Sequence, residues 1–459
     1  MKKVLVFVLC ISICFCNTFS SLAESRSIEA YRCINTNSEG WKVFHQAHPE
    51  IELHYSSAEY TTTSAIAGAL LTGEFRSDVF AMTNLFFDYQ QIMKKGYCAD
   101  LSQSEILTAF VQNMHPSIQK QVTVDEKIYA LPVSISFSYW KIVRESWEKA
   151  GLSTTDIPDT LDELFDFLDD WCDRIEQSPE PEISVWNAWD ITVYNASSYT
   201  QMFTEWVIDN YIMQRQFQME ELEFDADILL PLLKRCKEIG SRLYQLEYHP
   251  IDAENIGTSL FEPVSRPRWP DNTEDVVFMR LNETQPKLVK AKLTMYSINA
   301  SSDQISLCIE LLEHISDTLP DEAVMLLKQD AYAIPNPQYE ELRAAAQRNV
   351  DNTEAKLASP NLDAATRAEL EDHLEKYRYV LSKYDSDEKK YIITPTQMEQ
   401  YHLYVDMLYF DMPNEFSPDS PNYSILSNLE KQFSSGVISA DQFLNELSRI
   451  AYMIWLEKE

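Results

Sequence analysis

A long apolar run within the N-terminal half organises the hydrophobic pattern of the chain. From Ile128 to Tyr139, apolar side chains occupy both phases of an extended strand, and a polar turn at 125–127 precedes them. The Pro-Val-Ser sequence at 132–134 disfavours a central strand, because proline cannot donate a ladder hydrogen bond. We therefore predict a segment that leaves one sheet and enters another, as a hinge between two lobes. A helix from Trp140 to Ala150 should follow, ended by Gly151.

Periodic segments on either side predict further strands and helices. Strands are expected at 51–55, 77–82, 276–279 and 292–298, and helices at 39–48, 65–71, 224–243, 303–315 and 439–459. A capping box at 160–163 opens another, acidic helix. Its inward positions are Leu161, Leu164, Phe165 and Leu168.

The segment 338–384 has a different composition from the rest of the chain. It is rich in Ala, Glu, Arg and Leu, and it is interrupted by Ser-Pro-Asn at 359–361. This pattern predicts an antiparallel helical hairpin with solvated, charged faces.

Several segments carry distinctive motifs, which in chain order are 44–51 (FHQAHPEI), 70–80 (LLTGE followed by DVF), 94–101 (KKGYCADL), 127–152 (KIYALPV followed by WEKAGL) and 285–302. Together they resemble the extracellular solute-binding proteins of ABC importers, in their maltose-binding-like carbohydrate branch. A Tyr-Asn pair that is usual in the family is replaced by Ile142-Val143.

The resemblance implies an α/β, two-lobed, type II periplasmic-binding-protein-like fold, into which the helical hairpin is inserted. The first lobe is expected to comprise 24–133 and 283–318, and the second 134–282 and 319–459. Proteins of this kind close on their ligand by hinge motion.

Composition limits the classes of partner. The chain has 459 residues, which suffices for two lobes with apolar cores. The formal net charge is −34, so the electrostatic field opposes nucleic acid and anionic membrane surfaces. Aromatic residues make up 12% of the chain, which is too many for a disordered acidic segment.

The first 23 residues read as a secretory signal peptide. Lys2 and Lys3 precede the apolar run from Val4 to Phe15, and a small-x-small cleavage site ends at Ala23. We therefore expect cleavage after Ala23 and an extracytoplasmic location, which is secreted, periplasmic or at the cell surface. The residues before Cys10, Cys14 and Cys16 are large, which disfavours a lipid anchor.

The expected mature chain retains five cysteines, at positions 33, 98, 172, 236 and 308. Their wide spacing matches no metal-binding motif. An odd number leaves at least one thiol unpaired, and we favour five small apolar residues, mostly buried, over any disulfide.

The chain carries no recognisable enzyme motif. It lacks His-Glu-x-x-His, Gly-x-Ser-x-Gly, a phosphate-binding loop and Cys-x-x-Cys, and its eight histidines are scattered. We expect no catalytic residue, no metal and no cofactor. Adjacent acids such as Asp169 and Asp170 are interpreted as a solvated helix face.

Aromatic side chains supply the better binding signal. Sugar rings pack their C–H faces on indole, and their hydroxyls pair with Asp, Asn and Arg. The expected ligand-contacting residues of the second lobe are therefore Trp140, Trp186, Trp189 and Trp269, each with core packing as its alternative. In the first lobe, Tyr60, Asn84 and Phe86 follow predicted strands, whose carboxyl ends bind ligands in α/β sheets.

These observations lead to a functional hypothesis. The protein should capture a solute, most simply a neutral sugar, and deliver it to the membrane permease of an ABC importer. The alternative is a surface interaction protein that retains this fold but has lost solute binding.

Overall fold

A computed structural model describes residues 26–57, 63–84, 89–177, 183–186, 196–218, 223–246, 258–266, 269–270, 272–410, 416 and 422–458. Two compact units divide the chain. Unit 1 runs up to Val133 and includes Thr294–Pro320, and unit 2 comprises Ser134–Leu293 and Asp321–Glu459. The predicted signal peptide lies outside the described residues.

Unit 1 is built on a short, mainly parallel sheet. Its strands are β1 (Ser27–Tyr31), β2 (Glu52–Ser56), β3 (Val79–Thr83) and the second half of β10 (Val289–Ile298). The strand β1 pairs in parallel with both β2 and β3, and residues 294–298 pair antiparallel with β3. In β1, Ile28 and Ala30 are buried while Ser27 and Glu29 are only partly covered, as strand alternation requires.

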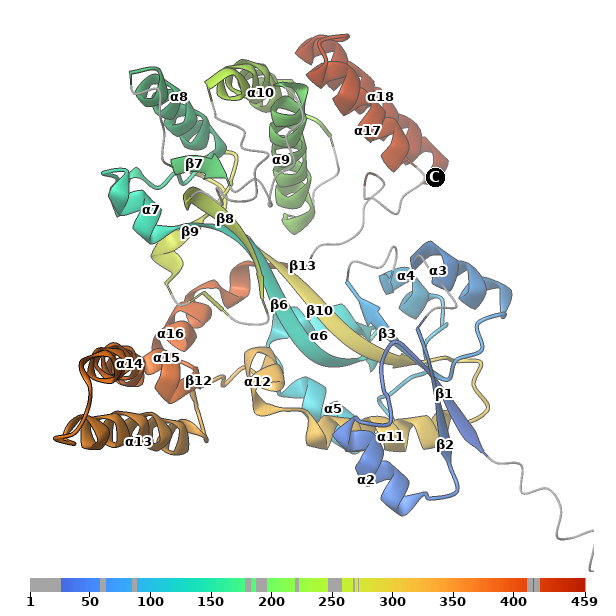
Figure 1. Cartoon of the computed structure of the whole chain (residues 1–459). Coiled ribbons are helices and arrows are strands. Elements are labelled where there is room, and N and C mark those ends of the chain that lie inside the picture. The colour runs from blue at the N-terminus through green and yellow to red at the C-terminus, as the bar shows by residue number, and fades with distance from the viewer. Residues whose placement is uncertain are drawn as a thin grey trace, which may run out of the picture. The chain divides into compact units, whose positions relative to one another are not determined.

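Helices cover these strands. They are α2 (Glu39–Ala47), α3 (Thr63–Thr72), α4 (Tyr89–Lys94), α5 (Glu105–Gln112), α6 (Pro116–Val122) and α11 (Ile305–Thr318). The helices α2 and α11 lie side by side (Figure 1). They approach closely at Gly40, where an added Cβ would lie 2.6 Å from the Ile315 side chain.

Unit 2 contains the strand β6 (Leu131–Ile142), which begins in unit 1. The strand β8 (Thr258–Arg266) pairs antiparallel with β6, from Phe137 opposite Arg266 to Ile142 opposite Phe261. The strand β7 (Ile183–Trp186) runs parallel to β8, and β9 (Val276–Val277) pairs with Trp140 and Lys141.

The predicted helix from Trp140 to Ala150 is therefore too long at its N-terminal end. Residues 140–142 continue β6, and helix α7 spans only Arg144–Lys149. Partner strands on both sides satisfy the backbone of Trp140 and Lys141, and this pairing overrides the local helical signal.

Long helices form the rest of the unit 2 core. They are α8 (Leu161–Gln177), α9 (Ala196–Phe217), α10 (Ala226–Leu246), α17 (Tyr423–Ser434) and α18 (Ala440–Lys458). Figure 1 shows α10 packed beside α9 and α8. The predicted inward stripe of α8 is confirmed, because Leu161, Leu164, Phe165 and Leu168 are at most 1% exposed.

Two arginines of α10 hold the acidic face of α8. Arg235 pairs with Asp162 and Asp166, at 3.2 and 2.5 Å. About two helical turns further along α10, Arg242 pairs with Asp169 at 2.5 Å and also with Asp173. The ion pairs relieve repulsion among the acids of α8.

The predicted helical hairpin is present in the structure. It consists of α13 (Tyr339–Leu357) and α14 (Ala364–Lys383), which pack against each other (Figure 1). The carboxylate of Asp363 caps α14 by accepting a hydrogen bond from the Thr366 N–H. Arg378 pairs with Glu354 across the hairpin at 2.6 Å, and no residue of α14 is buried.

The remaining elements are short. They are β4 (Thr123–Val124), β5 (Lys127–Ile128), η1 (Thr154–Asp156), η2 (Thr273–Asp275), α12 (Asp321–Val324), η3 (Met325–Leu327), β11 (Ile334–Pro335), α15 (Asp387–Lys390), β12 (Tyr391–Ile393), α16 (Pro395–Tyr404), η4 (Val405–Met407) and β13 (Leu408–Phe410).

Among the described residues, no helix combines the length and apolar character needed to cross a bilayer.

The cysteines are used as apolar side chains. Within the described ranges all five are free thiols, and four of them are buried. Burial raises the pKa of the Cys98 thiol to about 12, so this thiol stays protonated and unreactive at neutral pH.

A substitution at Gly240 tests the packing of α9 against α10. An added Cβ would lie 2.7 Å from the Thr200 backbone nitrogen, which cannot move freely within α9. We expect Gly240→Ala to lower the free energy of unfolding by about 1–3 kcal/mol, measured by urea denaturation. Gly68→Ala is the control, because its added Cβ meets nothing within 4 Å. There the same change should be neutral or stabilising by about 0.5–1 kcal/mol. A Gly240→Ala protein as stable as wild type would contradict this packing.

Candidate functional site

The carboxyl ends of three parallel strands gather polar groups in unit 1. Asn84 follows β3 directly, as predicted, and its side chain is fully buried. Tyr60 and Phe86, the other two candidates of this lobe, lie outside the described residues.

Sequence reasoning missed Arg32 at the same edge. This exposed residue follows β1, and its backbone φ of 54° is uncommon for a residue other than glycine. Its N–H donates to the Ser56 carbonyl at 2.9 Å, and its Nε donates to the Ser57 carbonyl at 3.1 Å. These bonds fix an arginine at the end of a buried strand, where ligands of α/β sheets bind. The available signal was a cation immediately after an apolar strand.

In unit 2, two of the tryptophans predicted to contact the ligand, Trp140 and Trp186, both pack against Trp206. Trp140 of β6 lies 5.3 Å from the Trp206 ring of α9, and Trp186 of β7 lies 5.7 Å from the same ring. Trp186 is 5% exposed and packs on Tyr199 and Phe203, so it forms the base of the cluster. Trp140 and Trp206 are only partly buried, and they are the members that retain accessible ring surface.

Trp206 is the second residue that sequence reasoning missed. The signal was a densely aromatic stretch, but the stretch alone did not show which ring would face outward. Trp189, the predicted neighbour of this cluster, lies outside the described residues.

Trp269 belongs to a different cluster of unit 2. Its ring is 2% exposed and lies 5.0 Å from Phe137, 5.3 Å from Tyr401 and 5.9 Å from Tyr404. The Trp269 carbonyl accepts a hydrogen bond from Gln397 Nε2 at 3.1 Å. Aromatic rings surround Trp269, and this packing favours its interpretation as a core residue.

Three acids meet where α9 contacts α17. Glu430 is only 3% exposed, and burial together with the nearby Glu205 and Asp209 carboxylates raises its pKa to about 8. Burial likewise raises the pKa of Glu205, whose carboxylate accepts a hydrogen bond from Gln201 at 2.9 Å. Glu430 is therefore largely protonated at neutral pH, which limits repulsion at this helix contact.

Comparison with known proteins identifies the fold. No protein-family model matches the sequence, and no curated protein matches it either. A solved structure that it resembles is the ABC substrate-binding protein Lmo0181 from Listeria monocytogenes in complex with cycloalternan. That match has 12% sequence identity and a TM-score of 0.51, and it covers 94% of this chain and 99% of that chain.

A second similar structure comes from a study of xylan utilization by Caldanaerobius polysaccharolyticus. It shows 12% identity over 92% of this chain and 99% of that chain, with a TM-score of 0.50. The chain thus has the type II periplasmic-binding-protein-like fold of ABC solute-binding proteins, and the predicted α/β fold class is confirmed.

A truncation at Trp269 measures the core role of this side chain. We expect Trp269→Ala to lower the free energy of unfolding by about 3–5 kcal/mol, because it leaves a cavity among Phe137, Tyr401 and Tyr404. Trp269→Phe, which refills part of that space, should cost less. Chemical denaturation of the two variants provides the measurement, and a near-neutral Trp269→Ala would show that the ring does not support the core.

Glu430→Gln should make the stability of the protein less sensitive to a rise in pH from about 5 to 8. The folded pKa of about 8 exceeds the ordinary unfolded value, so the native state holds a proton that the unfolded state releases between these two pH values. Wild-type stability should therefore fall, relative to the variant, by at most about 1.4 kcal/mol per pH unit from near pH 5 to pH 8. The difference should level off above pH 8. Thermal unfolding from pH 5 to 9 tests this, and parallel pH profiles would refute it.

Proposed function

We propose that the protein captures a carbohydrate outside the cytoplasmic membrane and delivers it to the permease of an ABC importer. The observation that carries the proposal is the fold, shared along nearly the whole chain with a substrate-binding protein that was solved with a carbohydrate. The predicted signal peptide supports an extracytoplasmic location, with cleavage after Ala23.

The proposed ligand-contacting groups are mainly hydroxyl-binding in unit 1 and ring-binding in unit 2. In unit 1 we assign Arg32 and the predicted Tyr60 as hydrogen-bonding groups and the predicted Phe86 as an apolar contact, while the predicted Asn84, which is fully buried, supports the strand end from within. The arginine offers fixed N–H donors to sugar hydroxyls.

In unit 2 we assign Trp140, Trp206 and the predicted Trp189 as stacking surfaces, with Trp186 supporting them from beneath. Trp269 supports the same unit from its interior. The predicted lobes, 24–133 with 283–318 and 134–282 with 319–459, are proposed as the two ligand-binding lobes.

A neutral ligand agrees with the charge of the protein. The sequence carries 72 acidic and 38 basic residues, and this excess repels free anions. Stacking on tryptophan requires no charge on the ligand. We propose binding and release without a chemical reaction, because no nucleophile and base come together in the motifs of this chain.

A thermal-shift screen followed by calorimetry tests this function. A neutral mono- or oligosaccharide should raise the melting temperature, and Trp140→Ala or Trp206→Ala should then weaken binding by about 1–3 kcal/mol, roughly ten- to a hundredfold. Arg32→Ala should weaken it as well, through lost hydrogen bonds.

Tyr379→Ala is the control, because this exposed aromatic side chain lies on α14 and far along the chain from these residues. Its binding should match wild type. Stabilisation by peptides or oligoanions with every sugar inert would overturn the carbohydrate assignment. A protein that binds no small solute would favour the surface interaction alternative.

A further inference from the structure

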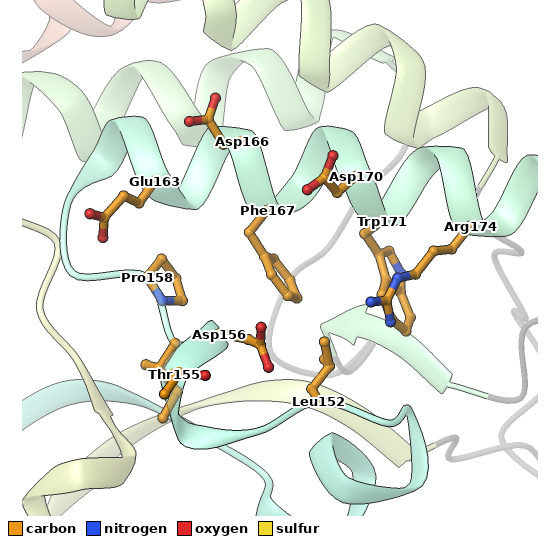
Figure 2. A pocket seen from close by; sticks show the side chains of 11 residues that line it. Leu152, Thr155, Asp156, Pro158, Glu163, Asp166, Phe167, Asp170, Trp171 and Arg174 are labelled. Carbon is orange, nitrogen blue, oxygen red and sulfur yellow. The ribbon is translucent and has the colours of Figure 1, made fainter.

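Unit 2 contains a small cavity that the proposed function does not use. It has a volume of about 250 Å³ and is lined by residues between 152 and 174 (Figure 2). One wall is the segment around η1, including Leu152 and Asp156, and the other is the face of α8 that carries Phe167 and Trp171. All lining residues belong to unit 2.

The helix supplies two parallel rows of side chains, each spaced by four residues. One row is Glu163, Phe167 and Trp171, and the other is Asp166, Asp170 and Arg174. Residues four apart lie above one another on a helix, so an aromatic row and a charged row run side by side along the cavity. Figure 2 shows both rows, with Asp156 on the facing wall.

The aromatic row is held rigidly. The Phe167 ring lies nearly parallel to Trp171, at 6.2 Å and 14°, and nearly parallel to Trp147 on its other side, at 5.1 Å and 14°. Phe167 is only half-buried. Phe167, held between two buried rings, thus presents a preorganised apolar surface that costs little conformational entropy when a ligand binds.

Two carboxylates remain available as acceptors. Asp156 receives hydrogen bonds from the Ser153 N–H and hydroxyl, both at 2.7 Å and both at Oδ2, which leaves Oδ1 open. Asp170 is exposed and has no hydrogen bond or ion pair within the part of the chain that the structure describes. Asp166 is already paired with Arg235, and Glu163 accepts from the Asp159 N–H at 2.7 Å.

Donors stand at the other end of the cavity. The Arg174 guanidinium lies 6.0 Å from the Trp171 ring centroid, and one of its N–H groups reaches the Ala150 carbonyl at 3.3 Å. Trp171 is 94% buried, since its exposed fraction is 6%, and its Nε1 has no partner among the described residues. A buried donor without an acceptor is costly, and a ligand oxygen that reached Nε1, which its neighbours cover in this structure, would relieve that cost.

The chemistry of these groups narrows the ligand class. The carboxylates repel an anion. A simple cation would suit the carboxylates, but it accepts no hydrogen bond from Trp171 or Arg174. A hydroxyl group both donates and accepts, and the C–H face of a sugar ring fits an aromatic surface.

We propose that this α8 cavity is a second carbohydrate subsite, which takes one neutral pyranose-sized ring. The volume is below the range of about 300–1,000 Å³ usual for larger ligands, so one ring fits and an extended oligosaccharide does not. The ring is either a free monosaccharide or the end of a longer glycan. The subsite lies wholly within unit 2, so it does not depend on the residues assigned to solute capture for the importer.

Ligand-observed NMR on the full chain tests the subsite. The probes are D-glucose, D-mannose, D-galactose and D-xylose, with oligosaccharides that end in the same rings as a second arm. Phosphate and tetramethylammonium serve as the charged probes. We expect saturation transfer from the protein to at least one neutral sugar, and a preference between the two arms identifies a free sugar or a glycan end.

Two variants locate the binding. Asp170→Asn removes an acceptor charge at an exposed position, and Trp171→Phe removes the Nε1 donor but keeps an aromatic ring. Each should weaken the subsite roughly tenfold, with melting temperature as the check on folding. Asp173→Asn is the matched control: it is an exposed aspartate of α8 that pairs with Arg242 and does not line the cavity.

Trp140→Ala separates this proposal from the proposed function. The subsite should bind its sugar in Trp140→Ala, whereas capture at the assigned stacking surface should be weakened. Wild-type affinity in both Asp170→Asn and Trp171→Phe would overturn the subsite, and so would loss of all sugar binding in Trp140→Ala. Binding of tetramethylammonium or phosphate in place of sugars would overturn it as well.

Discussion

The pairing of β6 with its neighbours is the constraint on which unit 2 depends. Six residues of β6 lie in register with β8, and two of them also pair with β9 on the other side. Because strand alternation sends successive side chains to opposite faces, this register places Phe137 on one face, against Trp269, and Trp140 with Ile142 on the other, where Trp140 lies beside Trp206. A slip of one residue would exchange these faces. The candidate stacking surface is therefore a direct result of backbone pairing.

Charge imposes a second constraint. Acids outnumber bases by nearly two to one, and the structure concentrates the few available arginines where acids are crowded. Arg235 and Arg242 each serve two or more carboxylates of α8, while Glu430 avoids repulsion by staying protonated. Glu163 and Asp170 of α8 have no cationic partner among the described residues, and Asp170 lines the cavity. Carboxylates without a cationic partner can accept hydrogen bonds from hydroxyl groups.

Elements whose structure depends on neighbouring residues in the chain could be predicted from the sequence. The stripe of α8 and the hairpin of α13 and α14 follow from helical periodicity and from a Ser-Pro-Asn break, so they could be predicted. Trp140 was assigned to a helix because its partners, β8 and β9, lie more than a hundred residues away. The packing of Trp269 against Tyr401 depends on an equally distant contact. The α8 cavity combines a helix face with a turn, and neither pattern alone indicates a cavity.

The order of strands in unit 1 has a consequence for how the protein is made. The strand β3 pairs with residues 294–298, more than two hundred positions later in the chain. During synthesis, Val79 and Phe80 must wait for that partner until all of 134–293 has emerged. Such long-range pairing slows folding and leaves an apolar strand edge open to aggregation in the meantime. An N-terminal region that cannot complete its sheet early stays unfolded for longer, which agrees with the export that we propose for this protein.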